Sequence, residues 1–179
     1  PAIHPGEYLS ISYGIPLWLS QRWLARLGYA QAESACVAAS ATPSLTFRVN
    51  RMRSTRDGLL EQFAKAEVGA HPTAISPVGV RLDKGQDVSS LPGFEAGDYY
   101  VEDEAAQLIP PILDPQSGES ILDVCAAPGG KATHLAELMG DRGAIVALDL
   151  KPSRLELLRD NYRRLGLHCI IPIIGDARR

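Results

Sequence analysis

The ten residues from Leu122 to Lys131 (LDVCAAPGGK) combine the end of an apolar segment with a turn that suits ligand binding. The segment Ser120–Cys125 is mostly apolar and rich in branched residues, as in a strand covered on both faces. Residues 126–130 (AAPGG) are small and let the backbone approach a ligand closely. Lys131 to Met139 then has helical spacing and ends before Gly140. A ligand would lie at the first turn of that helix, where free N–H groups favour negative or electron-rich groups.

Two acids follow at positions where further strands are expected to end. Ala144 to Leu148 is a second apolar run, and Asp149 comes directly after it, 19 residues after Gly130. A carboxylate at that strand tip can accept hydrogen bonds from both ribose hydroxyls of an adenosine group. His168 to Ile174 is a third apolar run, and Asp176 follows it closely. Because open α/β sheets bind ligands at the carboxyl ends of their strands, Asp176 could receive an adenine amino group.

Two other nucleotide-binding loops fit the same residues less well. A phosphate-binding loop, G-x-x-x-x-G-K-[ST], would have Cys125 in place of its first glycine and Ala132 in place of its Ser or Thr. A dinucleotide fingerprint, G-x-G-x-x-G, separates its first two glycines, whereas Gly129 and Gly130 are adjacent. The loop therefore favours S-adenosylmethionine, with NAD as the alternative cofactor. The candidate cofactor-binding residues are Cys125, Ala126, Ala127, Pro128, Gly129, Gly130, Lys131, Asp149 and Asp176.

The elements that must position these residues alternate between strand and helix. Between the second and third apolar runs, the segment after Lys151 begins with Pro152 and then has leucines at helical spacing up to Gly166. Pro172 lies within the third run, where proline is tolerated only at a sheet edge or a bulge. The order predicts a parallel α/β sheet whose third strand lies at an edge.

The amino-terminal part is expected to be organised separately. Leu17–Leu27 and Ala30–Ala41 have the patterns of packing helices. Leu45–Asn50 alternates like a strand, Thr55–Glu67 has helical spacing, and Ala74–Leu82 is strand-like, so the order predicts a βαβ module. The expected division is a helical segment (1–41), a small α+β domain (42–96) whose end overlaps a linker (Asp83–Gly97), and a cofactor domain (97–179).

Residues Gly97 to Asp176 resemble the RNA cytosine-5 methyltransferase family, most closely the Sun/Fmu type that methylates bacterial small-subunit ribosomal RNA. A weaker resemblance covers Ile15 to Leu82. The matching stretches are GDYYVEDEAAQL (Gly97–Leu108), LDVCAAPGGKATHLAEL (Leu122–Leu138), Asp149, Gly175–Asp176, Pro16–Leu19 and LTFRVNR (Leu45–Arg51).

The resemblance implies the amino-terminal half of a Rossmann-like S-adenosylmethionine methyltransferase sheet, preceded by a small RNA-recognition-like domain and amino-terminal helices. The small domain lacks the aromatic pair of a true RNA-recognition motif. The implied activity is methylation of carbon 5 of cytosine in RNA, with ribosomal RNA expected before transfer RNA. A cysteine thiolate adds to carbon 6, so that carbon 5 can take the methyl group. The target base would be unstacked and extruded into the pocket.

The family's catalytic cysteines would lie beyond Arg179, so no catalytic residue is assigned within this chain. Cys36, Cys125 and Cys169 are expected to be small buried or loop residues. The chain therefore resembles a fragment of an enzyme, containing three strands of a larger sheet, and is expected to be inactive alone. A non-catalytic fragment that binds S-adenosylmethionine or RNA is the alternative, and an NAD enzyme is a further one.

The charge of the chain gives only local support to RNA binding. The net charge is −3, which disfavours a general attraction to phosphates. Arginines nevertheless cluster within residues 22–26 and within residues 48–56. Their side chains could contact phosphates or form a solvated charged face. The candidate RNA-binding residues are Arg22, Arg26, Arg48, Arg51 and Arg53.

Composition indicates a soluble cytoplasmic protein. The chain has 179 residues, of which 45% are hydrophobic, so it can bury a core. No apolar run approaches the roughly 20 residues of a membrane span, and the start lacks a signal-peptide pattern. Three cysteines without regular spacing argue against a disulfide scaffold. The four histidines are too scattered for a metal site, so neither a membrane nor a metal is expected.

Overall fold

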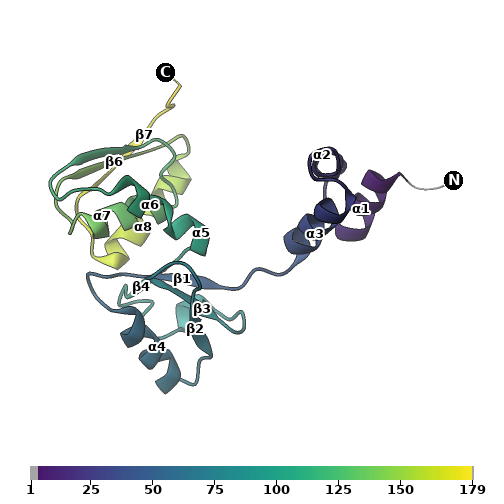
Figure 1. Ribbon diagram of the computed structural model, residues 1–179. Coiled ribbons are helices and arrows are strands. Elements are labelled where there is room, and N and C mark those ends of the chain that lie inside the picture. The colour runs from purple at the N-terminus through teal and green to yellow at the C-terminus, as the bar shows by residue number, and fades with distance from the viewer. Residues whose placement is uncertain (1–3, 179) are drawn as a thin grey trace. The chain divides into compact units, whose positions relative to one another are not determined.

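The computed structural model describes residues 4–178, and the chain divides into two compact units, one ending at Pro43 and the other beginning at Ser44 (Figure 1). The first unit packs three helices around Leu9, Ala32 and Cys36. The two predicted helices are confirmed, and Trp18 in the first of them is 62% exposed. The helices of this unit are α1 (Pro5–Tyr13), α2 (Leu17–Leu27) and α3 (Tyr29–Ser40).

The second unit begins with a four-stranded sheet in the order β2-β3-β1-β4. Its strands are β1 (Thr46–Val49), β2 (Ala70–Pro72), β3 (Gly79–Leu82) and β4 (Tyr99–Val101). Every paired neighbour in this sheet is antiparallel. The prediction of a βαβ module is therefore wrong. A short strand, β2, follows the helix and forms a hairpin with β3. Strand β3 is therefore antiparallel to β1, whereas a βαβ crossover would make the two strands parallel.

Helix α4 (Arg56–Lys65) packs on this sheet through an aromatic core. The rings of Phe47 and Tyr99 have centroids 4.5 Å apart, and Phe63 of α4 lies 5.7 Å from the Tyr99 ring. Thr55 caps the helix by accepting a hydrogen bond from the Gly58 N–H. The segment before β4 contains only a short 3₁₀ turn, η1 (Val88–Ser90).

The second sheet is parallel, as predicted, with the order β5-β6-β7. Its strands are β5 (Ser120–Asp123), β6 (Ala144–Asp149) and β7 (Ile170–Ile174), and β7 with Pro172 lies at an edge of the described sheet, as expected. The helices are α5 (Glu104–Gln107), α6 (Ile109–Leu113), α7 (Gly130–Leu138) and α8 (Pro152–Leu165).

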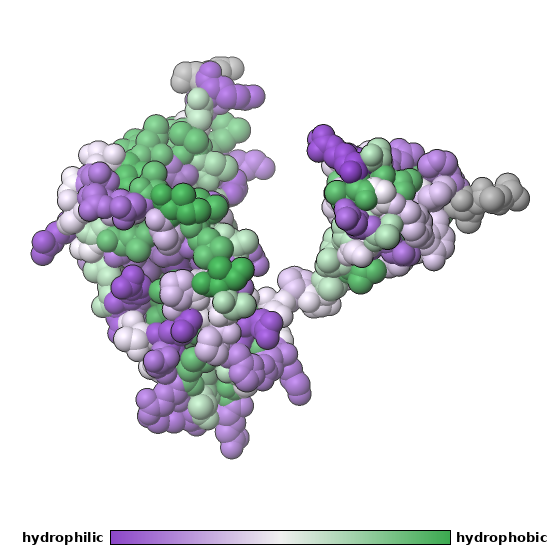
Figure 2. Space-filling view, in the orientation of Figure 1, coloured by the Kyte–Doolittle hydropathy of each residue, from purple (hydrophilic) through white to green (hydrophobic). Residues whose placement is uncertain are grey.

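Helices α7 and α8 lie on one face of this sheet, where Ile145 and Ala147 are fully buried (Figure 1). The other face is open among the described residues, because Leu122 is 61% exposed and Ile171 is 49% exposed. Figure 2 shows apolar side chains gathered over this part of the molecule. The expectation that β5 is covered on both faces is therefore wrong: branched apolar residues occur on both faces, but described helices cover only one.

Gly97 marks a close backbone contact between the small sheet and α8. Its φ of +73° favours glycine, and a Cβ there would meet the Arg164 carbonyl oxygen. Gly118 has a similarly positive φ of +92°, but a Cβ there would meet no other described atom within 4 Å. We expect Gly118→Ala to lower the free energy of unfolding by about 1 kcal/mol. Gly97→Ala should lower it by about 3 kcal/mol, because the clash adds to the strain. Urea unfolding of both variants checks this, and equal losses would contradict the close contact.

Candidate functional site

The carboxyl ends of β5 and β6 bring the AAPGG loop and Asp149 together. The Ala126 N–H donates to the Leu148 carbonyl oxygen at 3.0 Å. The buried Asp149 carboxylate accepts hydrogen bonds from the N–H groups of Ala127 at 3.3 Å and Lys151 at 3.1 Å. Arg154 forms an ion pair with the same carboxylate at 3.2 Å. Asp149 therefore organises the loop through internal partners and also lies at the predicted strand tip.

The glycine turn ends in an uncapped helix. Gly129 has a φ of +115°, and a Cβ there would lie 2.6 Å from the Leu158 Cδ1 atom. No side chain caps the start of α7, so its first-turn N–H groups can meet a ligand. Asp123 accepts a hydrogen bond from the Cys125 N–H at 3.1 Å and so braces the loop.

A cavity of about 200 Å³ lies against this turn. Loop residues 125–128 line it together with Asp123, Gly130 and Lys131, and residues 100–102 close it from the end of β4. The contribution of residues 100–102 was not predicted from the sequence. The available indication was GDYYVEDEAAQL, which matched the family without suggesting a role in the site.

Asp176 lies beyond the end of β7, next to the end of β6. The Gly175 N–H donates to the Asp149 carbonyl oxygen at 3.2 Å, which joins the two strand ends. The Asp176 carboxylate forms an ion pair with Arg178 at 2.7 Å, and this partner lowers the pKa of Asp176. Neither Asp149 nor Asp176 lines the cavity at the glycine turn. The two acids and the cavity therefore form separate parts of one candidate site.

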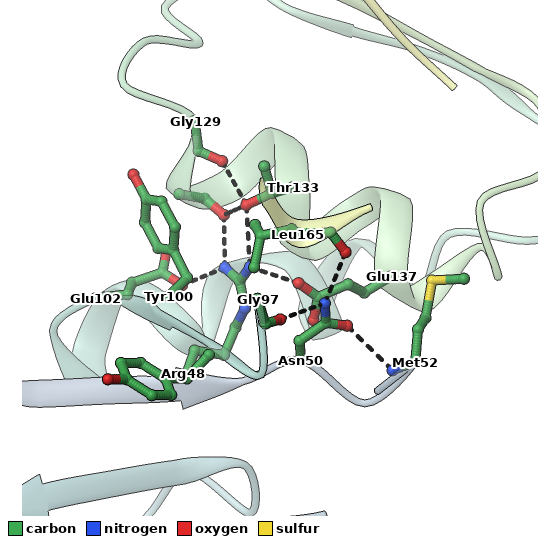
Figure 3. Close-up of polar contacts among 12 residues, drawn as sticks. Arg48, Asn50, Met52, Gly97, Tyr100, Glu102, Gly129, Thr133, Glu137 and Leu165 are labelled. Carbon is green, nitrogen blue, oxygen red and sulfur yellow. Dashed lines mark hydrogen bonds and ion pairs between the residues drawn. The ribbon is translucent and has the colours of Figure 1, made fainter. Parts of the chain in front are cut away.

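Arg48 lies at the centre of a buried polar cluster between β1 and α7 (Figure 3). Its Nη1 atom donates to Glu102 Oε2 at 2.5 Å and to the Gly130 carbonyl oxygen at 2.7 Å. Its Nη2 atom donates to Thr133 Oγ1 at 2.9 Å and to Glu137 Oε1 at 2.8 Å. The prediction that Arg48 contacts RNA is wrong, because the side chain is fully buried and occupied by internal partners.

In this cluster the Arg48 guanidinium forms ion pairs with two buried carboxylates, those of Glu102 and Glu137. Burial raises the pKa of Glu137 to about 7, although Arg48 opposes the shift. Burial also raises the pKa of Glu102. Burial lowers the pKa of the neighbouring His134 to about 3, so this imidazole is neutral and adds no second positive charge. One carboxyl group is therefore expected to keep its proton near neutral pH.

This cluster predicts a distinct pH dependence of stability. The pKa of Glu137 is about 7 in the folded protein and its ordinary value is 4.5, so the folded state binds a proton that the unfolded state loses. This group's stabilising effect is present below pH 4.5 and is lost as the pH rises through 7. The free energy of unfolding of Glu137→Gln, relative to that of the parent, should therefore rise by about 2–3 kcal/mol from pH 5 to pH 8. Urea unfolding at both pH values measures the difference, and parallel pH curves would contradict it.

The remaining candidate arginines differ in whether their side chains are free to contact RNA. Arg22 and Arg26 on α2 and Arg51 after β1 are exposed. Arg53 is partly committed to the protein, because it donates to the carbonyl oxygens of Leu165 at 3.0 Å and Ala96 at 2.7 Å.

The three cysteines fit the roles expected of them. Cys36 and Cys169 are buried, and burial raises the pKa of both thiols, that of Cys169 to about 12. Cys125 is exposed in the cofactor loop. Within residues 4–178, no group of three or more potential ligands could hold a metal ion. No helix in that range is long and apolar enough to cross a membrane.

Family models match two parts of the chain. Residues 110–179 match the model described as 16S rRNA methyltransferase RsmB/F. Residues 15–89 match the ferredoxin-like domain described as Methyltr_RsmF/B-like. The second match agrees with the antiparallel sheet and its helix.

Curated relatives and solved structures align over nearly the whole chain. A probable ribosomal RNA small subunit methyltransferase B from Synechocystis is 41% identical over 94% of this chain and 38% of its own length. The Bacillus subtilis protein of the same description is 35% identical over 98% of this chain and 39% of its own. A methyltransferase homologue from Pyrococcus horikoshii has a TM-score of 0.85 at 27% identity, covering 98% of this chain and 58% of the other. The chain thus spans about two fifths of the length of these curated relatives.

Proposed function

Because the chain belongs to the Sun/Fmu type of RNA methyltransferase, we propose that it forms the S-adenosylmethionine-binding part of an enzyme that methylates 16S ribosomal RNA. The observation that carries this proposal is the uncapped start of α7 beside Asp149, at the carboxyl ends of parallel strands. Among residues 4–178, the sheet has one open face and no strand pairs with the outer edge of β5, which leaves room for further strands. The enzyme would act in the cytoplasm.

The residues present fit S-adenosylmethionine. The cavity of about 200 Å³ is smaller than the roughly 300 Å³ at the lower end of ligand pockets, so it would enclose one end of the cofactor. The first-turn N–H groups of α7 would receive the methionine carboxylate. Asp149 would bind the ribose hydroxyls and Asp176 the adenine amino group. The bound cofactor supplies an electrophilic methyl group.

Asp149 retains the capacity for a ribose contact. A carboxylate has about four acceptor positions, and three internal donors occupy this one. The Arg154 side chain is 42% exposed and can move aside, whereas the two backbone donors are fixed in the loop. A ribose would therefore compete with Arg154 and leave the backbone contacts intact.

The proposed reaction is methylation at carbon 5 of cytosine. A cysteine thiolate from the region that the chain does not span would add to carbon 6, and carbon 5 would then take the methyl group, with S-adenosylhomocysteine as the leaving group. Removal of the carbon 5 proton by a base would expel the thiolate from carbon 6 and restore the double bond. The exposed Arg22, Arg26 and Arg51 would contribute phosphate contacts. Ribosomal RNA is preferred over transfer RNA because the named relatives are small-subunit methyltransferases.

The reaction can be tested by joining this chain to the carboxyl-terminal part of the Bacillus subtilis relative. The fusion is incubated with 16S rRNA and methyl-labelled S-adenosylmethionine, and the nucleosides are separated. We expect labelled 5-methylcytosine from the fusion and none from this chain alone. Label on adenine or ribose would contradict the cytosine assignment, and 5-methylcytosine from the pure chain would contradict a nucleophile outside it.

A further inference from the structure

Arg48 connects the small sheet to the two glycine carbonyls of the cofactor turn. Its Nη1 atom donates directly to the Gly130 carbonyl oxygen at 2.7 Å. Its Nη2 atom donates to the Thr133 hydroxyl at 2.9 Å, and that hydroxyl donates to the Gly129 carbonyl oxygen at 2.7 Å. Each carbonyl oxygen is therefore linked to Arg48, and the Gly129 oxygen also accepts the backbone N–H of Thr133 at 2.8 Å.

These contacts also set the direction of two N–H groups. A trans peptide is planar, and its C=O and N–H bonds point in opposite directions. The only cis bond among the described residues is Ala127–Pro128, so the two peptides after Gly129 and Gly130 are trans. Holding their carbonyl oxygens toward Arg48 turns the N–H groups of Gly130 and Lys131 the other way. Both of these residues line the cavity at the glycine turn.

The cluster is built tightly against the turn. A Cβ on Gly130 would lie 2.7 Å from Glu102 Oε1, so a side chain at this position would displace the carboxylate that holds Arg48. Glu102 and Glu137 bind the guanidinium from two elements, β4's end and α7. The planar fork of an arginine can serve all four partners at once, whereas a lysine ammonium has only three donors on a flexible stem.

We propose that Arg48 is a positioning residue for S-adenosylmethionine, which sets the first-turn N–H groups of α7 through the carbonyl oxygens of Gly129 and Gly130. The inference rests on the proposed function in its choice of ligand. It makes β1 of the small sheet part of the cofactor site without contact to the cofactor. Loss of Arg48 or of its Thr133 link weakens cofactor binding beyond any effect on global stability.

Thr133→Val tests the link, because it removes the hydroxyl and leaves both ion pairs of Arg48 in place. We expect S-adenosylmethionine affinity to fall about tenfold by calorimetry. We also expect the hydrogen-exchange protection factor of the N–H at position 133, which donates to the Gly129 carbonyl oxygen at 2.8 Å, to fall relative to β6. Thr133→Ser retains the hydroxyl and should restore both properties. Thr73→Val removes a similar hydroxyl contact, to the Ser76 carbonyl oxygen at 3.0 Å, and should change neither.

Arg48→Lys supplies the second test, with an expected loss of affinity of at least tenfold in a folded sample. Unchanged affinity and unchanged local exchange in Thr133→Val would overturn the positioning role. If the parent chain does not bind S-adenosylmethionine, the proposed function fails. The protection factor of the N–H at position 133 still decides whether Arg48 holds the turn.

Discussion

Arg48→Met is expected to lower the free energy of unfolding at pH 8 by about 3–5 kcal/mol, the usual effect of removing one partner from a buried ion pair. The side chain is fully buried and forms hydrogen bonds of 2.5 Å to Glu102 and 2.8 Å to Glu137. Methionine fills similar space but leaves both carboxylates without their cation. Urea unfolding monitored by circular dichroism measures the loss.

The pH dependence separates this effect from simple loss of packing. Without Arg48 the two carboxyl groups can avoid unpaired charge by taking up protons, so the destabilisation should be smaller at pH 5 than at pH 8. Adding Glu102→Gln and Glu137→Gln to Arg48→Met should recover much of the stability at pH 8. Arg51→Met, an exposed control, should change stability by less than about 0.5 kcal/mol. Equal losses in the two arginine variants would contradict the buried cluster.

Asp149→Ala is expected to weaken S-adenosylmethionine binding about 100-fold. Two hydrogen bonds from ribose hydroxyls to a carboxylate contribute about 3 kcal/mol together, which corresponds to about two powers of ten in the dissociation constant. The alanine variant also loses the contacts to the N–H groups of Ala127 and Lys151, so the loop becomes less ordered. Calorimetric titration of the folded variant gives the affinity.

Three variants distinguish the ribose contact from loop order. Asp149→Asn keeps the shape and one acceptor oxygen, and should lose less affinity than Asp149→Ala. Arg154→Ala removes the competing internal partner and should not weaken binding if the ribose displaces that guanidinium. Asp160→Ala changes an exposed acid on α8 and should leave affinity unchanged. An Asp149→Ala variant that binds as tightly as the parent would contradict the ribose role.

The parallel sheet could be predicted from sequence because its information is local. Each strand is an apolar run, each helix has its own periodicity, and Gly140 and Gly166 mark helix ends. The turn between β5 and α7 was predictable for the same reason, because two adjacent glycines indicate a sharp backbone turn. Asp149 follows directly from the end of β6.

The small sheet could not be predicted in the same way. Strand β2 has only three residues, is half-buried or exposed, and contains Pro72, so no local pattern marks it. Without β2, a strand followed by a helix and another strand has the pattern of a parallel crossover. Strand β4 belongs to the same sheet but lies in the segment that resembled the cofactor domain.

The role of Arg48 could not be predicted because its partners are distant in the sequence. Glu102 and Glu137 are 54 and 89 residues away along the chain, so no local spacing indicates the cluster. In sequence, Arg48 is one of several arginines in a short segment, and clustered charge usually indicates a solvated face. Only the packing of β1 against α7 separates the buried Arg48 from the exposed Arg51.

We expect this chain to bind S-adenosylmethionine at the glycine turn. Isothermal titration of the purified chain with S-adenosylmethionine and, separately, with NAD measures this binding. The predicted result is saturable binding of S-adenosylmethionine, which Asp149→Ala abolishes or strongly weakens, and no binding of NAD. Binding of NAD alone, or no binding of S-adenosylmethionine by a folded sample, would contradict the claim.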